Sequence, residues 1–96
     1  MIRLEIIANN TVEMDIFKAL EEVDPGFYYT RLNNVHGRGK SDPRMGDAIW
    51  PEENFIYIIY TDNIIGSKMI ESVKAVKEKF TIEGIKIFKN LCEEID

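Results

Sequence analysis

The sequence has few of the residues that build disulfides and metal sites. Its 96 residues include one cysteine, Cys92, and one histidine, His36. A single cysteine cannot form an internal disulfide, and no Cys/His cluster has the spacing of a zinc site. The lone thiol fits a reducing compartment. We therefore expect neither a disulfide-stapled secreted domain nor a structural zinc domain.

Long apolar runs and clusters of basic residues are also absent. No segment reaches the ~18 consecutive apolar residues that a membrane-spanning helix needs. The first ten residues, MIRLEIIANN, have no cleavable signal pattern. The 12 Lys and Arg are spread along a chain with 17 Asp and Glu and a net charge of −5, whereas nucleic-acid binders normally present a basic patch. We expect a cytoplasmic protein with no membrane insertion and no nucleic-acid partner.

The length and composition predict one domain, residues 1–96. Alternating apolar and polar residues at 2–7 predict a strand. Asn10 precedes Glu13 by three positions, which predicts a capping box with Asn10 as the N-cap of a helix. An Asp-Pro-Gly tripeptide then ends this helix. The apolar positions at helical spacing are Val12, Ile16, Leu20 and Val23.

The rest of the chain predicts three more strands and a second helix. Aromatic and β-branched residues mark strands at 27–35 and 54–61. Asp62 or Asn63 can cap a helix, and a fourth strand is predicted at 82–91. The order predicts an α+β, ferredoxin-like βαββαβ fold, in which an antiparallel sheet carries both helices on one face. The core positions of the second helix are Ile65, Met69, Val73, Val76 and Phe80.

The predicted strand at 54–61 is apolar on both of its faces. In a two-layer fold the sheet face away from the helices should be polar at every second position. A contiguous apolar face left in water would promote aggregation. We predict that another subunit covers this face; the alternative is that the chain's own loop or tail shields it. The two sets are Phe55, Tyr57, Ile59 and Ile56, Ile58, Tyr60.

Residues 36–53 have neither helical nor strand periodicity, which is unusual for so long a segment within a compact domain. Such a loop is commonly functional, and the alternative is a mobile, solvated hairpin. Gly37 and Gly39 can turn backbone N–H groups toward an anion. The charged residues between His36 and Gly46 are Arg38, Lys40 and Arg44 against Asp42.

This segment also contains Gly-Lys-Ser, the last three residues of a phosphate-binding P-loop. The complete motif, G-x-x-x-x-G-K-[ST], would place its first glycine at position 34, where the sequence has Asn34. Asp42 and Pro43 follow, and no helical pattern comes after them. The sequence therefore does not predict a nucleotide hydrolase.

Three segments carry a resemblance to a known family: VHGRGK at 35–40, the apolar strand at 55–60 and EGIKIF at 83–88. In order and spacing, nearly the whole chain resembles the PII signal-transduction family and its PII-like relatives. The resemblance implies a homotrimer whose open sheet faces turn inward. It also implies ligand sites in the clefts between subunits, and a long T-loop, here 36–53, that contacts a target protein such as a transporter or a metabolic enzyme.

Residue by residue, the resemblance implies five effector-binding residues and no catalytic or metal-binding residue. It implies no certain cofactor, and an adenine nucleotide or a small anionic metabolite as the ligand. KEKFTIEGIK stands where the family has its glycine-rich phosphate-binding B-loop, and Glu83 would oppose a phosphate there. The chain also ends without the family's basic C-terminal extension. The implied effector-binding residues are Gly37, Arg38, Gly39, Lys40 and Lys86.

Three other interpretations remain open at this point. A metal-binding trimer, similar to the ferredoxin-like copper-tolerance proteins, would use loop carboxylates together with the single histidine and cysteine. An enzyme would need a nucleophile and a base, and no such pair is visible. A purely structural role is the third. The candidate metal ligands are His36, Asp42, Asp47, Glu52 and Cys92.

Overall fold

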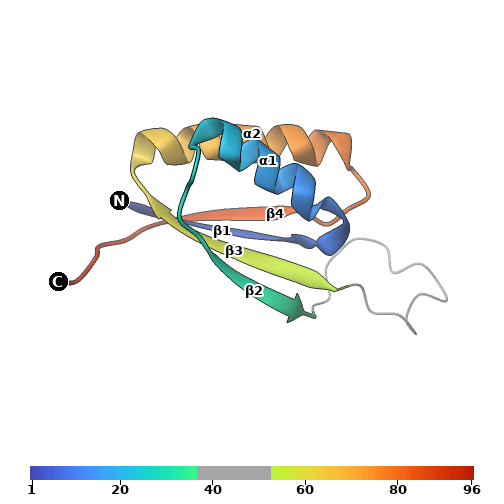
Figure 1. The fold of residues 1–96 in the computed structure, drawn as a ribbon, viewed down its shortest axis with the longest axis horizontal. Helices are drawn as coiled ribbons and strands as arrows, with labels where there is room; N and C mark the ends of the chain where they lie inside the picture. Colours follow the sequence, from blue (N-terminus) through green and yellow to red (C-terminus); the bar gives the residue numbers. More distant parts are fainter. Residues whose placement is uncertain (37–52) are drawn as a thin grey trace.

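The computed structural model describes residues 1–36 and 53–96 (Figure 1). Strands and helices follow in the predicted order, with one additional short 3₁₀ helix, η1, before the first α-helix. The predicted βαββαβ fold is therefore confirmed. The elements are β1 (Ile2–Asn9), η1 (Asn10–Val12), α1 (Glu13–Val23), β2 (Thr30–Val35), β3 (Asn54–Thr61), α2 (Asn63–Lys79) and β4 (Lys86–Leu91).

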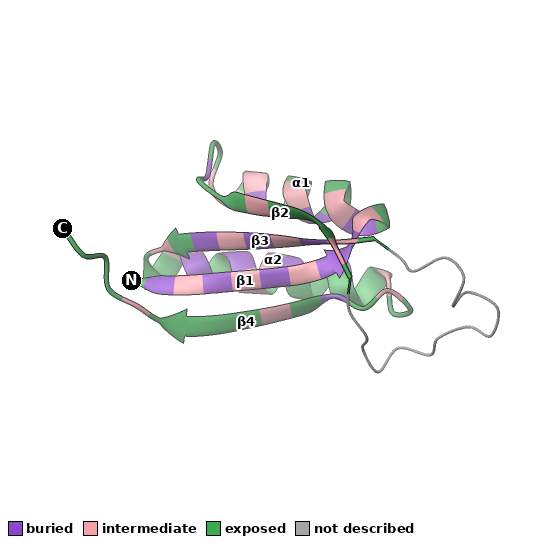
Figure 2. Ribbon diagram, turned by 90° about the horizontal axis from the view of Figure 1, so that it is seen from below, coloured by how far each residue is buried: buried purple, intermediate pink, exposed green. Residues whose placement is uncertain are grey.

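The four strands form one sheet in the order β2-β3-β1-β4, and every neighbouring pair is antiparallel. Both helices cover the same face of this sheet (Figure 1). The opposite face, which we call the open face, is uncovered in the described chain (Figure 2). No helix in the described ranges is long and apolar enough to cross a membrane.

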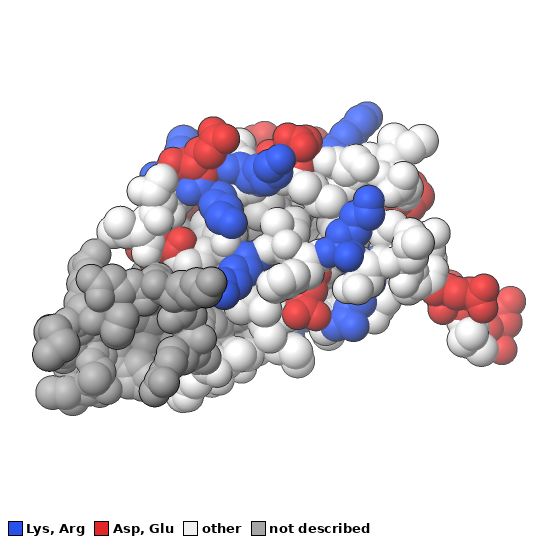
Figure 3. Space-filling view, turned by 180° about the vertical axis from the view of Figure 1, so that it is seen from behind, with Lys and Arg blue, Asp and Glu red and all other residues white. Residues whose placement is uncertain are grey.

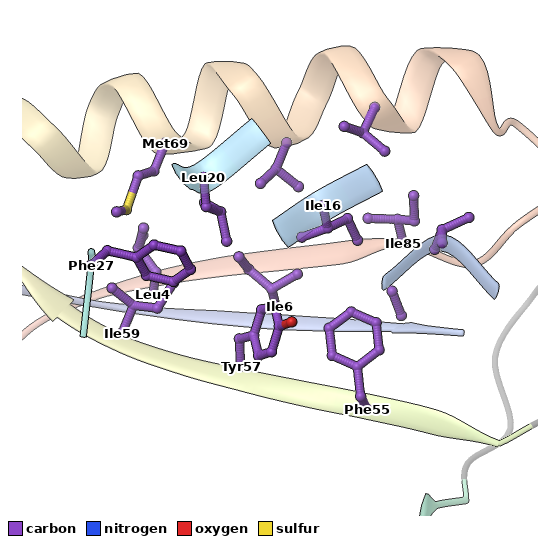
Figure 4. Packing of buried hydrophobic residues seen from close by; sticks show 14 of the residues in the cluster. Leu4, Ile6, Ile16, Leu20, Phe27, Phe55, Tyr57, Ile59, Met69 and Ile85 are labelled. Carbon is purple, nitrogen blue, oxygen red and sulfur yellow. The ribbon is translucent and has the colours of Figure 1, made fainter. Parts of the chain in front are cut away.

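The core lies between the sheet and the helices, and it follows from the period-two pattern of the central strands. Alternate residues of β1 and β3 point toward the helices (Figure 4). The helix residues that meet them recur every three or four positions, as an apolar helix stripe does. This confirms the predicted division of β3 into two apolar faces. The buried set from these elements is Ile2, Leu4, Ile6, Ala8, Phe55, Tyr57, Ile59, Ile16, Leu20, Met69, Val73 and Val76.

The predicted N-terminal capping box is wrong. Asn9, rather than Asn10, is the capping residue: its side chain accepts a hydrogen bond of 2.8 Å from the backbone N–H of Thr11. This bond starts the turn of η1, so α1 begins later, at Glu13, with no side-chain cap. The Glu13 carboxylate cannot complete a capping box because it bonds to side chains of the sheet.

The outer strands are shorter than predicted. β2 starts at Thr30 because Phe27 turns into the core, where it is buried. β4 starts at Lys86, after a turn in which the Glu83 N–H bonds to the Phe80 carbonyl. At α2 the structure selects Asp62 as the N-cap, since its carboxylate accepts a 2.8 Å hydrogen bond from a backbone N–H.

Candidate effector site

The open face carries an apolar patch beside the Arg3–Glu5 ion pair of β1, whose atoms lie 2.9 Å apart. Ile7 of β1 pairs with Ile56 of β3, and the next residue on the same side of β3 is Ile58. All three are half-buried by their neighbours on the sheet and lack a covering layer in the described chain. The larger apolar side chains around them are about half exposed: Leu32 at 45%, Phe88 at 49% and Tyr60 at 54%.

Lys86 lies on this open face. It is the first residue of β4, it is exposed, and it pairs with Ile7. The same row continues across the sheet through Ile56 to Leu32 of β2. Lys86 therefore lies at the end of the sheet where β2 ends and β3 begins. The other four predicted residues, 37–40, lie outside the described residues.

Lys86 is far from β2 within one copy of the chain. Their strands are the two outer strands of the sheet, separated by β1 and β3. Neighbouring strands are about 4.8 Å apart, so the backbones of Lys86 and Leu32 are separated by roughly 14 Å. A lysine at this position can reach a ligand only if that ligand extends over the open face or lies against a second copy.

The histidine and cysteine of the metal interpretation lie at opposite ends of the sheet. His36 follows β2, at the end where Asn9 pairs with Asn54, whereas Cys92 follows β4, at the end where its backbone N–H bonds to Met1. The length of β1 between these ends is roughly 24 Å. One ion cannot contact both side chains of one copy. The described residues contain no group of three or more potential metal ligands.

A groove of about 650 Å³ lies at the sheet end that is remote from Lys86. Its carboxylates come from the C-terminal tail, where acidic side chains gather at one end of the molecule (Figure 3). Carboxylates disfavour an anionic ligand, so an anion is better placed at the Lys86 end. The groove is lined by Met1, Tyr28, Tyr29, Thr30, Ile58, Tyr60, Cys92, Glu93 and Glu94.

A polar cluster on the helix-covered face was not predicted from the sequence. Arg31 of β2 donates to both carboxylate oxygens of Glu13, from Nε at 2.6 Å and from Nη2 at 2.7 Å. The Tyr57 hydroxyl of β3 donates to the same carboxylate at 2.7 Å. The Arg31 guanidinium also lies 6.0 Å from the centre of the Phe55 ring. We call Glu13, Arg31 and Tyr57 the Glu13 network.

The electrostatics of the Glu13 network favour an ionised carboxylate. The hydrogen bond from Arg31 is the main cause that lowers the pKa of Glu13 below its ordinary value, against the opposing effect of burial. Burial raises the pKa of Tyr57, and its bond to Glu13 raises it further. Both effects favour the neutral hydroxyl of Tyr57, which is the form that donates to Glu13.

The sequence did contain a signal for this network. Arg31 follows Phe27 and Tyr29 at intervals of two residues, so in an extended chain the three side chains lie on the same side. The rings of Phe27 and Tyr29 pack 5.1 Å apart. A charged residue at an inward-facing strand position needs a partner. The partner was missed because Glu13 was assigned to a helix cap.

No model of a known protein family matches the sequence, and no curated protein matches it. Solved structures that match its fold include PII-like proteins. CPII from Thiomonas intermedia K12, a nitrogen regulatory PII-like protein, superimposes in a complex with ADP, AMP and bicarbonate with a TM-score of 0.70, over 98% of this chain and 94% of CPII, at 15% identity.

A second CPII structure, bound to ADP and bicarbonate, gives a TM-score of 0.68 over 93% of this chain and 82% of CPII, at 18% identity. A PII-like protein from Thermus thermophilus gives 0.64 over 93% of this chain and 83% of its own, at 16% identity. The chain thus has the fold of PII-like proteins, as the resemblance implied.

Proposed function

We propose that this protein is a PII-like regulator that forms a homotrimer and binds a small anionic effector between subunits. The observation that carries the proposal is the apolar open face centred on Ile7, Ile56 and Ile58. Most soluble oligomers close by rotational symmetry, which lets one such patch be covered by its own copies. A trimer would also bring the Lys86 end of one subunit toward β2 of another.

The effector class follows from the charges that the chain offers. Lys86 lies on the open face, and the sequence adds Gly37, Arg38, Gly39 and Lys40 as further candidates. CPII was solved with ADP, AMP and bicarbonate, so an adenine nucleotide or a small anion is the ligand proposed here. Because Glu83 precedes β4 where the family has a phosphate-binding loop, AMP, a carboxylate metabolite or bicarbonate should bind better than ATP.

The proposed action is regulation rather than catalysis. Effector binding would shift the population of loop conformations of residues 36–53, and the loop would bind or release a target protein. The expected target is a transporter or a metabolic enzyme in the cytoplasm. Such a population shift needs no nucleophile or general base.

The assembly is tested by size-exclusion chromatography coupled to light scattering. The proposal expects a mass about three times the 11.1 kDa of the chain. A monomer at micromolar concentration would overturn the trimer, because the apolar open face would then be stable in water.

The effector site is tested by calorimetric titration with ATP, ADP, AMP and bicarbonate. Lys86→Ala should weaken binding of the best ligand about tenfold or more, since a charge-assisted contact contributes roughly 1.5–3 kcal/mol. The double variant Arg38→Ala/Lys40→Ala should do the same. The matched control is Lys89→Ala, which removes a lysine of the same strand that pairs with Leu4, on the helix-facing side. Unchanged affinity in Lys86→Ala and in the double variant would refute the site.

A further inference from the structure

The Glu13 network joins α1 to β2 and β3 near the middle of the sheet, in the row where Tyr57 pairs with both Arg31 and Ile6. Glu13 is in the first turn of α1, while Arg31 is in β2 and Tyr57 is in β3. The side chains of Glu13 and Arg31 are 20% and 30% exposed, so both are largely shielded from water. Hydrogen bonds to charged groups are roughly twice as strong as neutral ones, and Glu13 accepts three of them.

Apart from the Arg31 contact, β2 is attached mainly by its pairing with β3. It is an edge strand, and most of its residues are exposed. Its pairing with β3 is regular from Thr30 to Leu32 and then shifts in register before Val35. Asn34 within this irregular part has a φ of 53°, in the left-handed region. The bidentate contact of Arg31 lies one residue before Leu32, where the regular pairing with β3 stops.

The residue before β3 is attached to the stretch of chain that leads into α1. The backbone N–H of Asn10 donates to the Glu53 carbonyl at 3.0 Å. Asn10 begins η1, and Glu13 follows directly after η1. The short stretch Asn10–Glu13 therefore contacts β2, β3 and the residue that precedes β3.

We propose that the Glu13 network is a conformational coupling element that fixes β2, at Arg31 near its start, to the N-terminus of α1. When the contact is intact, β2 beyond Arg31 is held in one position relative to β3. When it is broken, this part of β2 detaches while the core of the sheet stays folded. That detachment would also lower the affinity of the effector site, a consequence that rests on the proposed function.

The coupling is tested by amide hydrogen exchange in Glu13→Gln and Arg31→Gln. Exchange of the Leu32–Val35 amides should become about tenfold faster, because a charged hydrogen bond is replaced by a neutral one. The amides of Leu4 and Ile6 should accelerate by less than those of Leu32–Val35, because they report on unfolding of the whole sheet. The matched control is Glu71→Gln, which removes one partner of an exposed 3.6 Å ion pair with Lys74.

Three outcomes decide this test. A faster exchange that is largest in β2, with the double variant Glu13→Gln/Arg31→Gln no faster than either single variant, supports coupling through one shared contact. Exchange that rises equally throughout the sheet overturns the proposal, since the network would then only stabilise the fold. Exchange in β2 that matches the Glu71→Gln control also overturns it.

A pH profile adds a readout that general stability would not give. The groups that bond to the Glu13 carboxylate are Arg31 from β2 and Tyr57 from β3, and the Tyr29 ring packs against Tyr57. Protection of Leu32–Val35 in the wild type should fall in acid as Glu13 becomes protonated. This step should be missing in Glu13→Gln, and its persistence there would count against the coupling.

The link between the Glu13 network and the effector site is tested with ADP, AMP and bicarbonate as ligands. If the wild type binds one of them, Glu13→Gln should weaken that binding several-fold, because only the fraction of molecules with an attached β2 is competent to bind. Equal affinity would refute the link to the effector site. If the wild type binds none of the three, the proposed function fails, and the exchange experiment still decides the coupling.

Discussion

Replacing Tyr57 with Phe tests how much one buried hydroxyl contributes to this fold. Tyr57 is 1% exposed, on the central strand β3. Its hydroxyl donates to Glu13 at 2.7 Å, while its ring packs against Phe55, with the ring centres 4.7 Å apart (Figure 4). Phe keeps the ring and its packing and removes only the hydroxyl, so the substitution isolates the hydrogen bond.

The size of the stability loss depends on the hydrogen bonds that Glu13 retains in the variant. A hydrogen bond to a charged group contributes roughly 1.5–3 kcal/mol. Glu13 retains both bonds from Arg31, and its side chain is 20% exposed, so its carboxylate stays paired and partly solvated after the change. We therefore expect a loss of about 1.5 kcal/mol in the free energy of unfolding. For a domain of this size, this corresponds to a Tm lower by roughly 6–12 °C.

The assay is urea and thermal unfolding followed by circular dichroism, at one fixed protein concentration because assembly makes the Tm concentration-dependent. The control is Tyr28→Phe, which makes the same chemical change at a side chain that is 91% exposed. It should change the free energy of unfolding by less than about 0.5 kcal/mol. If Tyr57→Phe is as mild as this control, the Glu13 network contributes nothing measurable to stability.

Three further predictions address other parts of the molecule. The deficit of Tyr57→Phe should shrink in acid, because the folded-state pKa of Glu13 lies below its ordinary value of 4.5. The stabilisation is complete above that value and is lost as Glu13 protonates at lower pH, and a constant deficit would contradict this. Gly66→Ala should lower the free energy of unfolding measured in urea by about 1 kcal/mol, because its Cβ would collide with buried Ile2 and lie 3.3 Å from Thr61 Cγ2. Overpacking costs roughly 1–3 kcal/mol, which exceeds the gain in helix propensity. Increased stability would show that Ile2 can move. Ile58→Asp should give a lighter species in light scattering, since a buried unpaired carboxylate is unfavourable; an unchanged mass would remove Ile58 from the interface.

The local sequence was sufficient to predict an element wherever one strong periodicity or one turn tripeptide determined the backbone conformation. The pattern of β3 predicted its bounds and its two apolar faces, because side-chain direction in a strand alternates without regard to its partners. The stripe of α2 from Ile65 to Phe80 was equally informative. The bounds of β2 and β4 could not be predicted in this way, because an edge strand extends only as far as its neighbour pairs with it.

Glu13 illustrates the limit at the level of a single residue. Its spacing from Asn10 satisfies a capping pattern, yet its carboxylate binds Arg31 and Tyr57, which are 18 and 44 positions away in the chain. A charge-assisted contact with a strand outweighs a local cap because it satisfies a guanidinium and a hydroxyl that would otherwise be shielded from water without partners. Nothing within the local window of sequence could rank these two choices.

The sequence alone therefore determined the order of elements, the helix-facing core and the apolar character of the open face, since each depends on periodicity within a few residues. Only the tertiary structure decided which residues meet across the sheet. Pairing of β1 with both β3 and β4 places Lys86 in one row with Ile7, Ile56 and Leu32. It also places His36 and Cys92 at opposite ends of the sheet. Strand order and register arise from contacts between distant segments, and their side chains become neighbours only when the whole sheet has formed.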